Sequence, residues 1–559
     1  MSQKEVLKQI EDISTMTLYD VVAFHGFEHP HEPAVHYMGY KLTYSDLITR
    51  IDKTADYLVS LGVKKGMHIA LNLPNSVSFV CLFYALNKIG AVSVLTSPVD
   101  TAFELCEKLI QSDCTGLFYL ENFSKNILQT LELLDENTKQ KLKICSMVPI
   151  SNSLPLHLKL LTVTESIKSK KYNMGIKALL KESLKPYNVK NPLPTVFPVN
   201  ESPHSPAAIL FSGGTTGISK AAVHSSYSIN TSTKACIDTK LPIFKGDSFL
   251  SVLPAFHIFG LSVSLHIALA CGCRSILLPN FRAKQTTKAF IKQKPNFFAA
   301  VPFMVEKMLA TGLLQGVVKY EFDTSFFRQA FIGGDCLKTS VRDEFNSLIK
   351  KGGGEGFIES GYGLTENCPV SFNHSICGNP KSVGTPFGKT EVIIVDKTNQ
   401  LCPQGDIGEI CLFSPSNFLC YYKDNRETRR VFVTHEDKKL WLHTGDMGFI
   451  DDDGNLCFSY RQKKILKISG NSILAPVIEE CICSISFVKN VCVTVTDDIL
   501  TAYVIVAANE KDKHSDKGDE IKAHCASYLS KTHIPKKVVI CTINELPVNL
   551  LGKISFGRL

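Results

Sequence analysis

Residues 209–220, ILFSGGTTGISK, decide how the rest of the chain is interpreted. An apolar run leads into three glycines, four hydroxyl residues and one lysine. Glycines let backbone amides turn toward an anion, and hydroxyl and lysine side chains donate to phosphate oxygens. The G-x-x-x-x-G-K-[ST] rule is not met, because Ile218 and Ser219 stand five residues after Gly213 and Gly214. Alone, the stretch fits a phosphate loop and a flexible turn equally well.

Length and composition predict a globular protein of more than one domain. The 559 residues exceed what one hydrophobic core normally organises, and 44% of them are hydrophobic. The formal net charge of +8 is small for this length and is compatible with anionic substrates. No basic run contains interleaved aromatic residues, so nucleic-acid binding is not expected.

The 19 cysteines are scattered, which favours buried, reduced thiols. The close pairs Cys271/Cys273 and Cys481/Cys483 lack a second pair or histidines at zinc-ligand spacing. The N-terminal MSQKEVLKQIEDISTM predicts an amphipathic helix and lacks the apolar core of a signal peptide. We therefore expect a cytoplasmic protein without structural disulfides, and the cysteine spacing indicates no structural metal site.

The longest apolar run is IFGLSVSLHIALACGC, residues 258–273. It is short for a membrane span, contains His266 and is followed by Arg274. This run predicts a buried helix, and no transmembrane segment is expected.

The pattern of apolar residues predicts an α/β fold with a mostly parallel, doubly wound sheet. A helix is expected at 42–62, starting near Thr43 or Ser45 and stopping at Gly62. Further elements are a strand at 68–74, a helix at 78–90, strands at 91–98 and 207–211, and a helix, turn and strand at 286–304.

The chain changes character at three places. Residues 150–206 are polar, proline-dotted and lysine-rich, which predicts an irregular surface excursion. From about 390 onward, short strands and turns dominate. Near 460 a smaller αβ unit begins, so we expect domains at 1–460 and 461–559, with 508–520 as a solvated loop.

Six further segments, which follow ILFSGGTTGISK in order along the chain, favour the interpretation of that stretch as a phosphate loop. They are PAFHIFG (254–260), VPFM with GGDCL (301–304, 333–337), GYGLTE (361–366), WLHTGDMGFIDDDG (441–454), YRQKKILKISGNSI (460–473) and LPVNLLGKI (546–554). Together these segments closely resemble the signatures of the adenylate-forming enzymes, which include acyl-CoA synthetases, firefly luciferase and peptide-synthetase adenylation domains. The resemblance spans roughly residues 20–559.

The resemblance implies a large N-terminal domain of layered αβ sheets plus a distorted β-barrel, followed by a small mobile α+β domain. It also implies ATP, Mg²⁺ and coenzyme A as reactants or cofactors, and a small carboxylic acid as the other substrate. The acid would react with ATP to give an acyl-adenylate and pyrophosphate, and CoA would then displace AMP. WLHTGD and His257 look most like 4-coumarate–CoA ligase and medium-chain acyl-CoA synthetases, so an apolar fatty or aryl acid is expected.

The resemblance also assigns residue roles. Lys553 is the implied catalytic lysine of adenylation, six residues from the end, where its charge would stabilise the transition state. Thr365 is implied to contact the α-phosphate, Glu366 to bind Mg²⁺, and His257 to lie beside the acid and the thiol path. The other implied positions are the phosphate loop Ser212, Gly213, Gly214, Thr215, Thr216, Gly217 and Lys220; the adenine site Gly333, Gly334, Asp335, Tyr362 and Gly363; the ribose contacts Asp446 and Arg461; the hinge Lys463; and Gly470 beside pantetheine.

Four positions in the small unit depart from the family pattern: Tyr460, Lys464, Ile478 and Val548. They leave the ATP site intact but put domain-closing contacts and the thioester step in question.

Two alternatives stay open at this point. An adenylating enzyme can pass its acyl group to a carrier protein or to oxygen, and a silent binder can retain the fold without catalysis. The last residues, Gly557-Arg558-Leu559, only faintly resemble a peroxisomal signal. The sequence does not indicate an oligomeric state.

Overall fold

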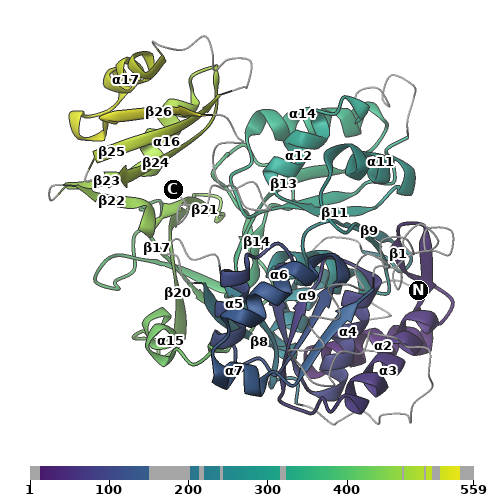
Figure 1. Cartoon of the computed structure of the whole chain (residues 1–559). Coiled ribbons are helices and arrows are strands. Elements are labelled where there is room, and N and C mark those ends of the chain that lie inside the picture. The colour runs from purple at the N-terminus through teal and green to yellow at the C-terminus, as the bar shows by residue number, and fades with distance from the viewer. Residues whose placement is uncertain are drawn as a thin grey trace.

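The computed structural model describes residues 13–149, 202–212, 219–238, 243–314, 323–468, 471–496, 499–506 and 517–541. Most of the predicted excursion at 150–206 and of the loop at 508–520 lies outside these ranges. The described elements form two large mixed sheets, one smaller antiparallel sheet and a C-terminal group of short strands and helices (Figure 1).

A seven-stranded sheet carries the strand that leads into residues 209–220. Its order is β18 (Cys420–Tyr421), β8 (Lys220–Ser225), β7 (Pro206–Ser212), β4 (Val92–Thr96), β3 (His68–Asn72), β5 (Gly116–Leu120) and β6 (Ile144–Val148). The strands from β7 to β6 are parallel, whereas β8 runs antiparallel to both β7 and β18. The helices of this part of the chain are α2 (Leu18–Glu28), α3 (Tyr44–Ser60), α4 (Val77–Ile89), α5 (Ala102–Gln111), α6 (Ser124–Leu133), α7 (Glu136–Lys141) and α9 (Ser226–Asp238).

A nine-stranded sheet carries the second half of the predicted site. Its order is β15 (Thr385–Pro386), β14 (Asn367–Phe372), β13 (Phe357–Leu364), β12 (Gln329–Ile332), β11 (Phe297–Ala300), β9 (Ser248–Ser251), β10 (Arg274–Leu277), β1 (Pro33–Tyr37) and β2 (Tyr40–Thr43). The strands from β13 to β1 are parallel. Helices α11 (Ala283–Gln293), α12 (Pro302–Leu309) and α14 (Thr339–Lys351) accompany it.

The remaining strands are mostly antiparallel, and they lie in the part of the chain after 390 where the sequence predicts short strands and turns. One sheet contains β16 (Glu391–Val395), β17 (Gly408–Phe413), β19 (Phe432–Thr434), β20 (Leu440–Ile450) and β21 (Leu456–Arg461), with α15 (Asn425–Val431) beside it. The C-terminal group contains η5 (Gln462–Lys464), β22 (Ile465–Ile468), β23 (Asn471–Leu474), α16 (Ala475–Cys483), β24 (Val488–Thr496), β25 (Ile499–Val506), α17 (Lys517–Tyr528) and β26 (Lys537–Cys541). This group has its own apolar core, and Figure 1 shows it apart from α2–α4.

Local signals explain the predicted helices. Thr43 caps α3, where its hydroxyl accepts from the Asp46 amide while the Asp46 carboxylate accepts from the Thr43 amide. Gly90 ends α4 with a φ of 80°, a left-handed conformation that glycine adopts without strain. The helices predicted at 42–62 and 78–90, and the strands at 68–74, 91–98 and 207–211, are therefore confirmed.

Two segments differ in detail from the prediction. Residues 258–273 are mostly buried and the segment is helical up to Ala270, but Phe259–His266 form the π-helix η4, followed by the short α10 (Ile267–Ala270). At 286–304 the helix, turn and strand are present, but Pro302 opens α12 instead of continuing the strand. Proline suits this first helical position because its missing N–H has no partner there anyway. Within the described ranges, no helix is both long and apolar enough to cross a membrane.

Candidate active site

Glycines bring three of the quoted segments together. A Cβ on Gly260 would lie 2.1 Å from the Pro254 carbonyl oxygen, so the PAFHIFG segment folds this tightly only with glycine at its end. A Cβ on Gly333 would lie 3.4 Å from the Gly361 carbonyl oxygen and 3.5 Å from the Phe259 ring. PAFHIFG, GGDCL and GYGLTE therefore meet at the carboxyl ends of parallel strands, where α/β sheets bind ligands.

A buried carboxylate joins three of the predicted nucleotide contacts. The Tyr362 hydroxyl donates to Asp446 Oδ2 at 2.8 Å, and Arg461 Nε lies 3.1 Å from Asp446 Oδ1. Asp446 and Arg461 are cross-strand partners in β20 and β21, which fixes this geometry. The Asp446 side chain is only 3% exposed, whereas that of Arg461 is 48% exposed. The cluster thus presents a half-exposed cation backed by a buried anion.

The pKa values of Tyr362 and Arg461, the two partners of the Asp446 carboxylate, are both raised. Burial, together with the Asp446 carboxylate, raises the pKa of Tyr362 well above its usual value. Asp446 is the strongest influence on Arg461 and raises its pKa, and the charges of Glu366 and Asp335 act in the same direction. Tyr362 therefore stays a hydrogen-bond donor and Arg461 stays charged throughout the physiological range.

Thr365 and Glu366 form the turn between β13 and β14. Leu364 pairs with Asn367, so the connection is a two-residue hairpin and not the start of a helix. His224 Nε2 donates to the Thr365 carbonyl oxygen at 2.8 Å, and the Phe418 amide donates to the Glu366 carbonyl oxygen at 2.8 Å. Burial lowers the pKa of His224 to about 4, so the imidazole is neutral and its Nε2 carries the proton. The backbone of this turn is therefore held from both sides.

Tyr421 links the turn to the end of the 209–220 stretch. Its hydroxyl donates to Glu366 Oε1 at 2.6 Å, and Lys220 Nζ lies 4.9 Å from the centroid of its ring. Lys220 pairs with Ser212 across β7 and β8 and forms an ion pair with Glu427 of α15. Ser212 and Lys220, at the two ends of the predicted phosphate loop, are therefore neighbours across two strands. Lys220 also lies beside the ring of Tyr421, whose hydroxyl contacts Glu366.

Glu366 is suited to hold a cation. Within the described part of the chain, its Oε2 atom has no hydrogen-bond partner, while Tyr421 orients the other oxygen. Mg²⁺ is typically held by one or two carboxylate oxygens together with phosphate oxygens and waters. One oriented carboxylate with one available oxygen fits that requirement.

His257 lies two residues before the first residue of the π-helix and is partly exposed. Its ring packs 4.8 Å from that of Phe256. Burial, and to a smaller extent the charge of Lys108, lowers the pKa of His257 to about 4. The imidazole is therefore neutral, which suits contact with an apolar substrate or a thiol better than a permanent charge.

The turn at Gly333 and Gly334 presents backbone without side chains. Gly334 has a φ of 81°, and the Gly333 amide donates to the Ala300 carbonyl oxygen at 3.2 Å. Asp335 Oδ1 accepts from the Cys336 amide at 3.0 Å. Gly363 lies in β13 between Tyr362 and the hairpin turn.

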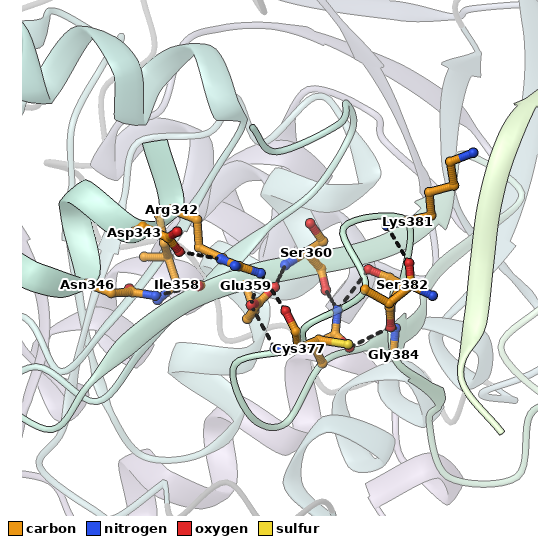
Figure 2. Close-up of polar contacts among 12 residues, drawn as sticks. Arg342, Asp343, Asn346, Ile358, Glu359, Ser360, Cys377, Lys381, Ser382 and Gly384 are labelled. Atoms are coloured by element: carbon orange, nitrogen blue, oxygen red, sulfur yellow. Dashed lines mark hydrogen bonds and ion pairs between the residues drawn. The ribbon is translucent and has the colours of Figure 1, made fainter. Parts of the chain in front are cut away.

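A second, buried network anchors the start of β13. Figure 2 shows Arg342 of α14 meeting Glu359 of β13 beside Cys377. Arg342 Nη1 lies 3.0 Å from Glu359 Oε1 and donates to the Cys377 carbonyl oxygen at 2.7 Å. The Glu359 carboxylate also accepts from the Ser360 and Cys377 amides. These bonds fix the strand that carries Tyr362 and leads into Thr365 and Glu366.

The structure therefore brings Tyr362, Asp446 and Arg461 into contact and joins Glu366 to Lys220 through Tyr421. The described residues also include the predicted Ser212, His257, Gly333, Gly334, Asp335, Gly363 and Thr365, whereas Lys463 has no described side chain. The remaining predicted residues lie outside the described ranges. They are Gly213, Gly214, Thr215, Thr216, Gly217, Gly470 and Lys553.

Sequence reasoning missed three residues that position the site: His224, Tyr421 and Glu427. Their partners are 141, 55 and 207 residues away in the chain, so no local spacing connects them. The available signal was weak: His224 follows three apolar residues in its strand, and Tyr421 follows the short LC segment before α15.

Two of the departures in the small unit have compensating contacts. Lys464 Nζ lies 2.6 Å from Glu479 Oε2 of α16, so the unusual lysine has an acidic partner. Ile478 is fully buried in the apolar core of the group. Tyr460 pairs with Met447 across β21 and β20, and Val548 lies outside the described residues.

Known proteins resemble this chain over most of its length. A long-chain-fatty-acid–CoA ligase of Bacillus subtilis (strain 168) is 27% identical over 554 residues, covering 97% of this chain and 94% of the relative. A probable 4-coumarate–CoA ligase 1 of Dictyostelium discoideum is 27% identical over 470 residues, covering 82% and 80%. The fold matches that of the ATP-bound RpMatB-BxBclM chimera B1 with a TM-score of 0.79, at 21% identity and with 97% and 98% coverage.

The sequence model of one enzyme family matches most of the chain. It is described as AMP-binding enzyme and aligns with residues 24–422. This stretch contains the strands and turns that carry Ser212, Lys220, Thr365 and Glu366. The resemblance to adenylate-forming enzymes and the predicted α/β fold are confirmed, and the chain belongs to the AMP-binding enzyme family.

Proposed function

We propose that this chain is an ATP-dependent acid–CoA ligase that activates an apolar fatty or aryl carboxylic acid. The observation that carries the proposal is the contact of Tyr362, Asp446 and Arg461 beside the Thr365–Glu366 turn. A buried carboxylate suits two ribose hydroxyls, and the half-exposed Arg461 suits a ribose or phosphate oxygen. Relatives named as long-chain-fatty-acid and 4-coumarate CoA ligases support a thioester-forming reaction.

Each half-reaction uses a different set of residues. In the first, a carboxylate oxygen attacks the α-phosphorus of ATP, and the bond to the β-phosphate bridging oxygen breaks to release pyrophosphate. Lys553 would stabilise the negative charge that gathers between acid and α-phosphate. Thr365 would donate to the α-phosphate, while Glu366 would hold Mg²⁺, which neutralises phosphate charge when bound.

In the second half-reaction, the CoA sulfur attacks the acyl carbon and AMP leaves. Partly exposed, neutral His257 would lie beside the acyl group, and Gly470 would allow close passage of pantetheine. We propose domains at 1–460 and 461–559, with Lys463 as the hinge between the adenylating and thioester-forming arrangements.

The test is pyrophosphate release from the full chain against a panel of fatty and aryl acids, with and without CoA. The proposal predicts release that depends on an apolar acid and Mg²⁺, and acyl-CoA as the product when CoA is present. Acid-dependent release without acyl-CoA would contradict the ligase assignment and favour transfer to a carrier protein.

Lys553→Ala separates the two steps. It is expected to lower adenylation by at least about 100-fold while leaving a supplied acyl-adenylate competent for transfer to CoA. Lys536→Ala, at an exposed position of the same C-terminal group, is the matched control and should retain both activities. Full adenylation by Lys553→Ala would remove that lysine from the mechanism.

A further inference from the structure

A second cluster of ligating side chains lies on the antiparallel sheet, apart from the Glu366 carboxylate. Cys411 of β17 and His443 of β20 are cross-strand partners, and His435 lies in the turn between β19 and β20. The Cys411 sulfur and one ring nitrogen from each histidine all lie within 4.8 Å of one another. Because 24 residues separate Cys411 from His435, the spacing of cysteines and histidines along the chain did not reveal this cluster.

The two imidazoles already face each other. His435 Nε2 lies 2.9 Å from His443 Nε2, so one nitrogen donates and the other presents its lone pair. Cys411 is fully buried, whereas His435 and His443 are partly exposed. The cluster is therefore closed on the thiol side and accessible on the imidazole side.

Glu409 holds His443 in the orientation that a metal ligand needs. His443 Nδ1 lies 3.0 Å from Glu409 Oε2, and the Gly445 amide donates to Glu409 Oε1 at 2.8 Å. The Nδ1–H bond to a carboxylate leaves Nε2 free of a proton and directed at the cluster. A carboxylate behind a histidine is the usual outer partner of a metal-binding imidazole.

The turn that carries His435 is also fixed. The Trp441 indole donates to the Asp437 carboxylate at 3.2 Å, and the His435 ring lies 6.1 Å from the Trp441 ring. The Lys438 amide donates to the His435 carbonyl oxygen at 2.9 Å. His435 is thus presented by a structured turn.

We propose that Cys411, His435 and His443 bind one Zn²⁺ ion, with Glu409 as the residue that orients His443. One thiolate and two imidazoles suit borderline-soft divalent cations and not Mg²⁺, which prefers oxygen ligands. Tetrahedral zinc places sulfur and nitrogen ligands about 3.5 Å apart and two nitrogens about 3.3 Å apart. Because the three ligand atoms already lie within 4.8 Å of one another, the cluster needs side-chain displacements of only about 1 Å to reach that geometry, and a solvent molecule on the exposed side would complete four ligands.

The proposed zinc site lies close to Asp446, one of the predicted nucleotide contacts. His443 precedes Asp446 by three residues in β20, and Glu409 touches both His443 and the Gly445 amide. A bound Zn²⁺ ion would tie β17, β20 and the 435–439 turn together directly beside Asp446. We therefore expect zinc to raise the thermal midpoint of the chain.

The test uses the full chain after chelator treatment, titrated with Zn²⁺ in competition with a coloured chelator. The expected result is one tight site per chain. Co²⁺, which takes the same tetrahedral ligands, should give a visible spectrum with a sulfur-to-cobalt charge-transfer band.

His435→Asn is the decisive variant because His435 is partly exposed and outside the apolar core. It should weaken Zn²⁺ binding about 100-fold, and Glu409→Gln should weaken it about 10-fold. His524→Asn and Cys483→Ser, a partly exposed histidine and an exposed cysteine of the C-terminal group, are matched controls and should bind as the unmodified chain does.

Three results would overturn the assignment: no saturable one-to-one binding, unchanged affinity in His435→Asn, or a cobalt spectrum without the sulfur band. Cys411→Ser tests the thiol directly, and if it fails to fold, the cobalt spectrum of the unmodified chain still decides the ligand. None of these measurements depends on ligase activity, so the result is independent of the proposed function.

Discussion

Two arginine–carboxylate pairs support the same site but differ in exposure. In the Arg342–Glu359 pair both side chains are buried, at 11% and 3% exposure (Figure 2). In the Arg461–Asp446 pair the carboxylate is equally buried, but the arginine is 48% exposed. In the first pair, Arg342 and Glu359 form further hydrogen bonds with the protein backbone. In the second pair, the Arg461 cation stays accessible. The difference separates a contact that builds β13 from one that is available to a ligand.

Removing the buried arginine is expected to have the largest effect. Arg342→Met leaves the Glu359 carboxylate buried without its partner and should lower the free energy of unfolding by about 3–5 kcal/mol. Arg461→Met also leaves a buried carboxylate, but truncating the half-exposed arginine lets water reach Asp446, which keeps its bond from the Tyr362 hydroxyl, so the loss should be smaller, about 1 kcal/mol. Urea denaturation of both variants measures the difference.

The double variant Arg342→Met/Glu359→Leu checks the cause. Burial raises the pKa of Glu359 even beside Arg342, so desolvation weighs heavily on this pair. Replacing both partners removes the buried charge but leaves the Ser360 and Cys377 amides without their acceptor, so it should recover only part of the stability that Arg342→Met loses. Equal destabilisation by Arg342→Met and Arg461→Met would remove the distinction between the pairs.

Asp446→Asn is expected to damage catalysis more than folding. It removes the charge that faces Arg461 and the acceptor that we assign to the ribose, and should lower kcat/KM for ATP about 100-fold, or about 2.7 kcal/mol. Steady-state pyrophosphate release measures this. Asp406→Asn, at an exposed loop position before β17, is the matched control and should leave kcat/KM unchanged.

Acidification is expected to destabilise the protein through His224. Its pKa is about 4 in the folded chain against 6.5 as the ordinary value, so only the unfolded chain takes up this proton between those pH values. Stability is therefore lost as pH falls below about 6.5, by about 1.4 kcal/mol per unit for this group. His224→Gln keeps a donor for the Thr365 carbonyl oxygen and should lose about 2 kcal/mol less than the unmodified chain between pH 7 and pH 5. An identical pH profile for the two proteins would contradict this role.

Tyr421→Phe is expected to have the smallest effect. It removes the hydroxyl that orients Glu366 but keeps the ring against Lys220, so adenylation should fall about tenfold, mainly through the dependence on Mg²⁺. Tyr422→Phe is a matched control because its hydroxyl donates to Asp113, away from the site. If both variants retain full activity, Tyr421 has no positioning role.

The parts of the fold that sequence reasoning predicted correctly are those set by local chemistry. The Thr43 cap, the Gly90 stop and the alternation of strands and helices all depend on residues close together in the chain. The ordered segments likewise assigned Tyr362, Asp446 and Arg461 to one site, and these three residues are in contact, whereas their binding roles stay predictions.

The parts that were missed depend on contacts between distant segments. Tyr421 reaches Glu366 only because β18 adds to the edge of the seven-stranded sheet. The acidic partner of the unusual Lys464 is Glu479, which lies outside the sequence segment that contains the lysine. The π-helical turn of Phe259–His266 has the same apolar composition as an ordinary buried helix, so no pattern distinguishes them.

The most direct test of the central claim is acid-dependent exchange of labelled pyrophosphate into ATP, measured without CoA on the unmodified chain and on Asp446→Asn. We expect exchange that rises with an apolar acid in the unmodified chain and is largely lost in Asp446→Asn, while both proteins unfold at similar urea concentrations. Exchange at the unmodified rate in Asp446→Asn, or no acid-dependent exchange from the unmodified chain, would contradict it.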